Sequence, residues 1–179
     1  MSLHIVMGPM WAGKSSYLIN TIKELKTKGV NYLAITTYLD TRYSKNSICS
    51  HTNEKEEAVS CMELLPISLL ESYQTANTIL IEESQFFPDL YDFVMKAVEK
   101  DHKNIICVGL DGDSERKPFG DLLKLIPYCD SVKKLTASCH ECGEPALFTY
   151  RIPKVLEQIV IGADTLYKPL CRKHYVSGC

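Results

Sequence analysis

The sequence lacks any apolar run approaching the roughly 20 residues that a helix needs to cross a bilayer. Its first residues, Met1 to His4, lack the charged segment, the long apolar segment and the small-residue cleavage site of a secretory signal peptide. It also lacks a basic excess, because 20 Lys and Arg stand against 22 Asp and Glu and leave a net charge of −2. That balance gives no electrostatic reason to expect nucleic acid or an anionic membrane as partner. We therefore expect a cytoplasmic protein whose partners are small molecules.

The remaining composition is that of a globular protein large enough to bury a core. Of its 179 residues, 45% are apolar and 23% are charged. Four runs rich in apolar and β-branched residues predict strands at residues 3–7, 32–37, 78–83 and 105–110. Apolar residues recur at helical spacing over 14–28 and 89–100. Residues 40–60 are polar and aperiodic, and predict a mobile loop.

The order of these elements indicates the fold class. Strands and helices alternate, which is typical of an α/β protein with a mostly parallel sheet and helices on both faces. From about Ser138 onward the pattern changes to short strands and turns around cysteines. We predict an α/β domain over residues 1–137 and a small second domain over residues 138–179.

The strongest local motif is the run Gly8-Pro9-Met10-Trp11-Ala12-Gly13-Lys14-Ser15, which matches the phosphate-binding P-loop pattern in full. Its glycines let backbone N–H groups turn toward phosphate oxygens, and Lys14 places a positive charge at the β- and γ-phosphates. The Ser15 hydroxyl reaches Mg²⁺, and the following helix adds its positive N-terminal end. This motif between a strand and a helix predicts a P-loop (RecA-like) fold that binds ATP or a close relative.

Two acids, Glu82 and Glu83, follow the apolar run that ends at Ile81. Acids at the end of a parallel strand lie at the edge of the sheet where nucleotides bind. One can serve Mg²⁺ and the other can accept a proton, and neighbouring strand residues face opposite sides, so the two should have different roles. The alternative interpretation is a strand end with two solvated acids.

Two spaced pairs, Cys139-x-x-Cys142 and Cys171-x-x-His174, have the ligand spacing of a tetrahedral zinc site. Four protein ligands leave no open position, which predicts a structural role for the metal. Disulfides or a redox Cys-x-x-Cys are the alternatives, and neither explains the second pair. His140 is interpreted as a loop residue. The scattered cysteines are interpreted as small buried hydrophobes: Cys49, Cys61, Cys107 and Cys129.

Together these segments resemble the cytosolic-type (type II) thymidine kinases over essentially the whole chain. The resemblance rests on the P-loop run, the zinc pairs and five further segments: Asp40-Thr41-Arg42-Tyr43-Ser44, Glu83-Ser84-Gln85-Phe86-Phe87-Pro88-Asp89, Asp111-Gly112, Arg116-Lys117-Pro118-Phe119-Gly120 and Ile161-Gly162-Ala163-Asp164. It implies transfer of the γ-phosphoryl group of ATP to the 5′-hydroxyl of thymidine, with Mg²⁺ and a structural Zn²⁺, in a homotetramer.

The resemblance also implies roles for individual residues. Glu83 would be the general base, and Arg42 would lie near the transferring phosphoryl group. The residues implied at the nucleotide and its metal are Gly8, Pro9, Met10, Trp11, Ala12, Gly13, Lys14, Ser15, Glu82, Gln85, Asp40 and Arg42. The residues implied around the nucleoside are Met10, Phe86, Leu110, Phe119, Thr149, Val160, Gly162 and Tyr167. The segment between the zinc pairs resembles the family's lasso loop, which folds over the base.

Simpler interpretations exist for several of these residues. Phe86 and Phe119 could be plain core aromatics, and Tyr167 could pack on the zinc site. Residues 116–117 could form a solvated turn, and Asp89 could only cap a helix.

The sequence departs from the family pattern at four positions. Glu82 replaces an aspartate, Ser84 replaces a glycine, and Ser114 replaces an aromatic residue near the sugar, which would loosen the pocket there. His174 replaces a cysteine of some members, and imidazole is an equally good zinc ligand.

Three other classes of protein are alternatives: an adenylate-kinase-like enzyme, a GTP-binding switch and a P-loop ATPase that binds nucleic acid. Adenylate-kinase-like enzymes lack the Glu-x-Gln-Phe-Phe motif that this chain has. A GTP-binding switch needs an Asn-Lys-x-Asp motif, which this chain lacks, and a nucleic-acid-binding ATPase needs a basic face, which the acidic charge balance disfavours.

Overall fold

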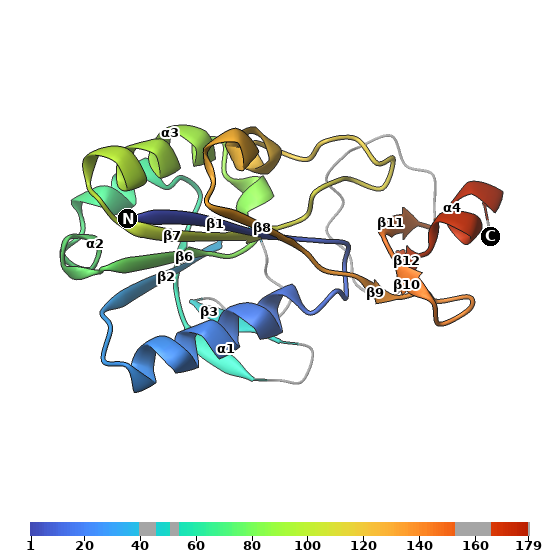
Figure 1. The fold of residues 1–179 in the computed structure, drawn as a ribbon, viewed down its shortest axis with the longest axis horizontal. Coiled ribbons are helices and arrows are strands. Elements are labelled where there is room, and N and C mark those ends of the chain that lie inside the picture. Colours follow the sequence, from blue (N-terminus) through green and yellow to red (C-terminus); the bar gives the residue numbers. More distant parts are fainter. Residues whose placement is uncertain (40–45, 51–53, 153–165, 179) are drawn as a thin grey trace.

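The protein is built on one parallel β-sheet (Figure 1). The computed structural model describes residues 1–39, 46–50, 54–152 and 166–178. In the order β5-β2-β6-β7-β1-β8, every neighbouring pair of the six strands is parallel. The strands are β1 (Ser2–Met7), β2 (Tyr32–Thr37), β5 (Val59–Cys61), β6 (Thr78–Ile81), β7 (Asn104–Gly109) and β8 (Ser131–Lys134). The predicted strands are confirmed, with shifts of one or two residues at some ends.

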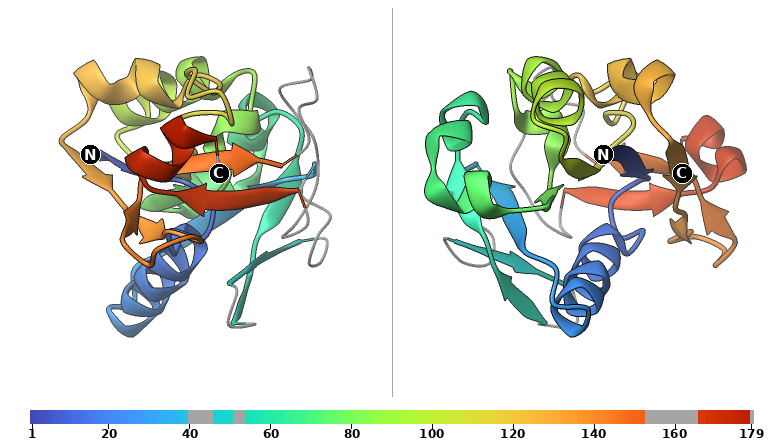
Figure 2. Two further views of the ribbon diagram at one scale, coloured as in Figure 1. Left: turned by 90° about the vertical axis from the view of Figure 1, so that its right-hand side faces the viewer. Right: turned by 60° about the vertical axis from the view of Figure 1, so that its left-hand side comes forward.

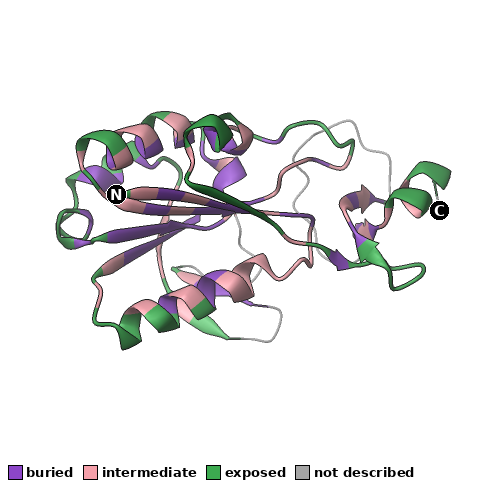
Figure 3. Cartoon of the chain, viewed as in Figure 1, coloured by how far each residue is buried: buried purple, intermediate pink, exposed green. Residues whose placement is uncertain are grey.

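Both faces of the sheet are buried, which explains why its central strands read as nearly continuous apolar runs (Figure 3). Successive side chains of a strand point to opposite faces, so the two clusters take alternate residues. Ile5, Ile79 and Ile105 belong to one cluster, while Leu80 and Val108 belong to the other.

Helix α1 (Lys14–Thr27) covers one face through its buried residues Leu18, Ile19 and Ile22. The helix ends as the sequence predicts. Gly29 takes φ +65°, its N–H donates to the carbonyl of Lys26, and the next N–H donates to the carbonyl of Leu25. This hydrogen-bond pattern is a Schellman motif, which requires a left-handed residue after the helix and so favours glycine.

The other face of the sheet is covered by several short helices, so the expectation of helices on both faces is confirmed (Figures 1 and 2). They are η1 (Leu65–Leu69), α2 (Glu71–Thr75), α3 (Leu90–Met95), the π-helical turn η3 (Lys96–Lys100) and η4 (Leu122–Tyr128). The predicted helix over 89–100 is thus α3 continued by η3. No helix within the described ranges has the length and apolarity that crossing a bilayer requires.

The prediction of a loop over residues 40–60 is wrong for the part that the structure describes. A hairpin of β3 (Ser47–Cys49) and β4 (Lys55–Glu57) lies along α1, and β5 forms one edge of the sheet. These strands are short and mostly polar, so their sequence carries no periodic signal. They are stabilised by the buried side chain of Ile48 and by ion pairs of 2.6 Å from Lys23 to Glu54 and from Lys26 to Glu56.

The C-terminal segment consists of short elements, as predicted from its change of pattern. Two antiparallel pairs precede a short helix: β9 (Ala137–Ser138) with β10 (Pro145–Ala146), β11 (Phe148–Arg151) with β12 (Tyr167–Leu170), and α4 (Arg172–Ser177). We call the described residues from Ala137 onward the C-terminal module. A small apolar cluster joins this module to Trp11 and Ala12 of the loop after β1. The division at residues 137 and 138 stays a prediction.

Candidate active site and metal centre

The loop of residues 8–15 connects β1 to α1 at the carboxyl edge of the sheet. A Cβ added to Gly8 would lie 2.5 Å from the carbonyl oxygen of Leu135, so only glycine fits there. Gly13 precedes the first residue of α1 with φ +78°. The ammonium of Lys14 donates a hydrogen bond of 2.7 Å to the carbonyl oxygen of Pro9, across the inside of the loop. A tight turn, a cation and a helix N-terminus therefore meet at one place.

The middle of this loop is held by the C-terminal module. The backbone N–H of Met10 donates to the hydroxyl of Thr149 at 3.0 Å, so two residues predicted to surround the nucleoside lie together. The next residue, Trp11, has φ +61°, a left-handed conformation that costs a bulky residue about 1–3 kcal/mol. Contacts elsewhere must offset that cost.

The two acids have different surroundings, although both lie beyond the end of β6, which the sequence predicted to extend to Glu83. Glu82 is 6% exposed, and its carboxylate accepts a hydrogen bond of 3.1 Å from the hydroxyl of Thr36 on β2. Glu83 is not a strand residue, because β6 ends at Ile81 and Glu83 takes φ +49°. The alternative of two solvated strand-end acids is therefore wrong, because Glu82 is buried and Glu83 is half-buried.

Gln85 fixes the position of the Glu83 carboxylate. Its side-chain amide donates to Glu83 at 2.6 Å, and its side-chain oxygen accepts the N–H of Leu110 at 2.9 Å. Two glycines make room for it: an added Cβ at Gly109 would lie 2.5 Å from that oxygen, and one at Gly120 would lie 2.2 Å from the Gln85 carbonyl oxygen. The packing of these glycines against Gln85 could not be read from the sequence.

Ser84, which stands where the resembled family has glycine, is fully buried inside the same turn. Its hydroxyl donates to the carbonyl of Ile81 at 2.9 Å and accepts the N–H of Val108 at 3.1 Å. This serine ties the acidic turn to β7, so the departure from the family pattern adds a constraint on the turn.

The aromatic residues expected around the nucleoside also meet. The rings of Phe86 and Phe119 pack edge to face with centroids 5.4 Å apart. Thr149 and Tyr167 are buried on the antiparallel pair of β11 and β12. Four other predicted site residues lie outside the described residues: Asp40, Arg42, Val160 and Gly162.

Residues 116–117 form an exposed turn, as the simpler interpretation expects, but Arg116 also contacts the C-terminal module. Its guanidinium lies 4.5 Å from the ring centroid of Tyr175 in α4, and the Ser114 carbonyl accepts a hydrogen bond from the Tyr175 hydroxyl at 2.6 Å. Lys117 is exposed, as expected of a turn, and pairs with Glu115. These contacts fix residues 111–120 against the C-terminal module.

The side chain of Asp89 does not cap the helix that follows it, contrary to the simpler interpretation. It stands immediately before α3, and its carboxylate makes no capping hydrogen bond there. It accepts instead the N–H groups of Leu64 and Leu65 at 2.8 and 2.7 Å. The residue therefore joins α3 to the beginning of η1.

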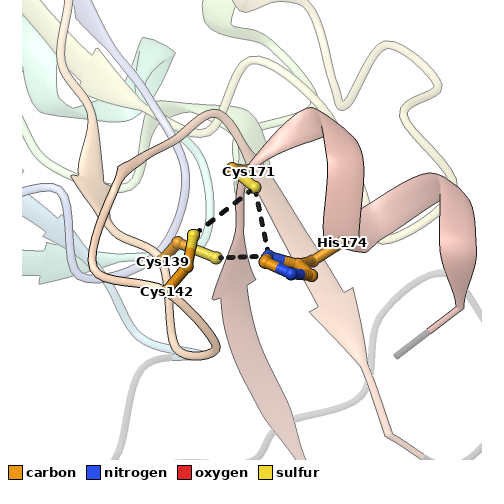
Figure 4. Close-up of side chains that lie close together, drawn as sticks. All are labelled: Cys139, Cys142, Cys171 and His174. Carbon is orange, nitrogen blue, oxygen red and sulfur yellow. Dashed lines mark hydrogen bonds between the residues drawn. The ribbon is translucent and has the colours of Figure 1, made fainter.

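The four predicted zinc ligands come together (Figure 4). The ligand atoms of Cys139, Cys142, Cys171 and His174 all lie within 4.8 Å of one another. The sulfur atoms of Cys142 and Cys171 are 3.9 Å apart, close to the roughly 3.8 Å edge of a tetrahedron with zinc–sulfur bonds of about 2.3 Å. The Nδ1 atom of His174 lies 3.3 Å from the sulfur of Cys171. The donor set and its spacing fit a structural zinc ion.

The electrostatic surroundings of Cys139 also suit a metal-bound thiolate. Burial of its thiol opposes ionisation, yet hydrogen bonds from the backbone of Cys171 and Glu141 outweigh that effect and lower its pKa to about 6. Zinc binds cysteine as the thiolate, so a lowered pKa reduces the cost of losing the proton. None of the seven cysteines within the described residues forms a disulfide, and the buried or half-buried placing of Cys49, Cys61, Cys107 and Cys129 confirms their interpretation.

A parallel α/β sheet, a glycine-bounded loop ahead of the first helix and a Cys₃His cluster define the class as a nucleotide-binding α/β protein with a zinc-type module. The family model described as thymidine kinase matches residues 1–175. The chain belongs to the thymidine kinase family, which confirms the resemblance found in the sequence and excludes the three rival classes.

Individual relatives agree over nearly the whole chain. Thymidine kinase a of Arabidopsis thaliana is 39% identical over 180 residues, covering 99% of this chain and 76% of the relative. The cytosolic thymidine kinase of Homo sapiens is 37% identical, covering 97% and 72%. The thymidine kinase of vaccinia virus strain Ankara is 34% identical, covering 98% and 97%.

Proposed function

We propose that this chain transfers the γ-phosphoryl group of ATP to the 5′-hydroxyl of thymidine, and of deoxyuridine, and so makes dTMP for DNA synthesis by salvage. The family match over residues 1–175 is the observation that carries this proposal. The geometry supports it, because the loop of residues 8–15 and Glu83 both lie at the carboxyl edge of the parallel sheet, where α/β proteins bind their ligands.

The loop of residues 8–15 binds the triphosphate of ATP. Its backbone N–H groups and the N-terminus of α1 attract phosphate oxygens, and Lys14 exchanges its contact with Pro9 for the β- and γ-phosphates. The Ser15 hydroxyl and the buried carboxylate of Glu82 are the oxygen ligands that fit Mg²⁺ and its water shell. When bound, this ion neutralises charge on the phosphates. Asp40 and Arg42 are assigned to the same region.

Glu83 acts as the general base. Little covalent work falls to the protein in phosphoryl transfer, so its main task is to align the 5′-oxygen with the γ-phosphate. The amide of Gln85 orients the Glu83 carboxylate through its 2.6 Å hydrogen bond, and that carboxylate takes the proton of the 5′-hydroxyl.

Thymidine binds between the acidic turn and the C-terminal module. Phe86, Leu110 and Phe119 form the apolar wall, which the edge-to-face contact of Phe86 with Phe119 supports. The 3.0 Å hydrogen bond from Met10 to Thr149 supports a phosphate loop that lies beside the C-terminal module. Tyr167 and the segment of Val160 and Gly162 complete the pocket as a lasso over the base. In this arrangement the module of residues 138–179 is a zinc-stabilised lasso domain, and the enzyme is a cytoplasmic homotetramer.

A coupled ADP-release assay with ATP, Mg²⁺ and each common nucleoside tests the proposal. Activity with thymidine, weaker activity with deoxyuridine and none with deoxycytidine or purine nucleosides is the expected pattern. Turnover with AMP alone, or silence with every nucleoside, would contradict it.

A further inference from the structure

Trp11 is the only tryptophan of the chain, and it occupies the middle of the phosphate loop. Its φ of +61° lies in the region that bulky residues avoid. A loop held in such a conformation needs support from its surroundings, because the backbone by itself prefers another shape. The contacts of Trp11 therefore identify what holds the loop.

Those contacts lead to the metal centre. Trp11 and Ala12 pack against a buried apolar cluster of the C-terminal module: Ala137, Cys139, Ala146 and Leu170. Cys139 is one of the four metal ligands, and Leu170 directly precedes another, Cys171. Trp11 also borders a cavity of about 300 Å³ whose other walls include His140 and Pro169 of the same module.

A second contact acts on the neighbouring residue. The N–H of Met10 donates to Thr149, which is 5% exposed on β11, and β11 pairs with β12, the strand that leads into Cys171. Two consecutive residues of the phosphate loop are thus held by the module that carries the metal ligands: Trp11 by the cluster that contains Cys139, and Met10 by β11, the partner of the strand that precedes Cys171. The first contact is apolar packing and the second is a hydrogen bond. They are therefore two independent observations that the C-terminal module holds the loop.

We propose that Trp11 is a positioning residue through which the metal centre sets the shape of the phosphate loop, so that zinc controls the affinity for ATP. Zinc fixes the two ligand pairs, the ligand pairs fix the apolar cluster, and the cluster holds Trp11 in its left-handed conformation. The inference rests on the proposed function, because it takes the loop of residues 8–15 to be the ATP phosphate site. It extends that function by giving zinc a role at the nucleotide as well as at the nucleoside.

Zinc removal from the whole chain tests the coupling directly. A chelator withdraws the metal while Trp11 fluorescence reports the loop, circular dichroism reports the fold, and calorimetry without nucleoside reports ATP binding. As zinc leaves, we expect the emission of Trp11 to shift to longer wavelength and the dissociation constant for ATP to rise about tenfold. A folded zinc-free protein with unchanged ATP affinity would overturn the proposal.

A matched pair of variants decides the question in the zinc-loaded protein, even if the zinc-free chain unfolds. Leu170 and Leu90 are both fully buried, but Leu90 lies in α3 under the other face of the sheet. Leu170→Ala should weaken ATP binding about tenfold with zinc still bound, and Leu90→Ala should leave ATP affinity unchanged despite a comparable loss of thermal stability. Equal effects of the two variants on ATP affinity would overturn the proposal.

The double variant Trp11→Gly with Leu170→Ala distinguishes an effect of Leu170 that acts through Trp11 from an effect that acts through a general loss of stability. If Leu170 acts through Trp11, the double variant should bind ATP no more weakly than Trp11→Gly alone. Additive losses would contradict this route. A zinc-loaded wild type that binds no ATP would overturn the proposed function together with this inference, whereas ATP binding indifferent to zinc and to Leu170 would overturn the coupling only.

Discussion

The hydroxyl of Tyr175 donates a hydrogen bond of 2.6 Å to the backbone carbonyl of Ser114. Tyr175 follows the metal ligand His174 in α4, while Ser114 lies in the segment 111–120 that ends at Phe119 and Gly120. The guanidinium of Arg116 stacks over the same tyrosine ring. The C-terminal helix therefore holds the segment that walls the proposed thymidine pocket.

Tyr175→Phe removes this hydrogen bond and keeps the ring. The net loss is about 1 kcal/mol, which corresponds to a roughly fivefold higher KM for thymidine. The KM for ATP and the zinc content should not change. Steady-state kinetics at saturating ATP measure the effect, and an unchanged KM for thymidine would show that the contact serves stability alone.

Glu83→Gln should lower kcat by about 10²- to 10⁴-fold, because it removes the general base and keeps the size of the side chain. ATP binding should remain near the wild-type level. Glu115→Gln is a suitable control, since Glu115 is an exposed acid that pairs with Lys117 in a nearby segment. Turnover of Glu83→Gln at the control's rate would refute the assignment of the base.

Gly120→Ala should abolish most activity. Its new Cβ would lie 2.2 Å from the Gln85 carbonyl oxygen, so the turn that carries Glu83 must move. Gly29→Ala is the matched control, because Gly29 also has a positive φ but has no neighbouring atom within 4 Å of a built Cβ. The control should lose about 1 kcal/mol of stability and keep its kcat. Thermal unfolding and kcat of both variants are measured together, and equal kcat values would contradict the steric argument.

Cys142→Ser should reduce zinc content and raise the KM for thymidine, because one of four ligands is lost from the centre that anchors β12 and α4. Cys129→Ser is the control, since Cys129 lies outside the cluster and its sulfur donates to the carbonyl of Ile126, a contact that serine can keep. Zinc is measured by a colorimetric chelator after denaturation. Full zinc stoichiometry with normal kinetics in Cys142→Ser would argue against the site.

The free energy of unfolding should fall in the acid range because of Asp101, which lies after η3 and away from the proposed site. Burial of the Asp101 carboxylate opposes its ionisation, but the ammonium of Lys96 and the hydroxyl of Tyr73 outweigh this and lower the pKa of Asp101. A carboxylate with a lowered pKa contributes stability that is complete above its unfolded pKa of about 3.9 and is lost as the pH falls through the folded value. Asp101→Asn should therefore flatten the loss of stability below about pH 4. Urea unfolding between pH 2 and pH 7 tests this, and parallel curves for the variant and the wild type would exclude the contribution.

The sequence was sufficient to predict the elements whose side chains repeat regularly. The strands of the parallel sheet and helix α1 have uninterrupted apolar patterns, and the metal ligands have a spacing that few other structures use. The hairpin of β3 and β4 has no such pattern, because each strand has three residues and ion pairs to α1 add to the burial of Ile48 in holding it. Local sequence cannot show contacts between side chains that are 30 residues apart.

The same reason limits what could be predicted of the site. The residue types at Gly8, Lys14 and Glu83 indicate their chemistry wherever they occur between a strand and a helix. The environment of Gln85 depends on Gly120, which comes from another loop and approaches it only in the folded protein. Arg116 is similar: it is exposed, as its charge suggested, but its position over Tyr175 follows from the packing of α4.

The place of β1 in the sheet has a consequence for synthesis of the chain. β1 pairs with β7 on one side and β8 on the other, so Ile5 aligns with Cys107 and with Val132. At about 5–20 residues per second, ribosomes need roughly 5–25 seconds to make the residues between β1 and its second partner. Both edges of the strand are unpaired until β7 emerges, and one edge stays unpaired until β8 follows. Unpaired strand edges are the sites where chains aggregate. A strand that lies second from one edge of the finished sheet is thus made first and fully paired late, and the yield of native protein should depend on how well nascent chains are shielded until residue 134 emerges.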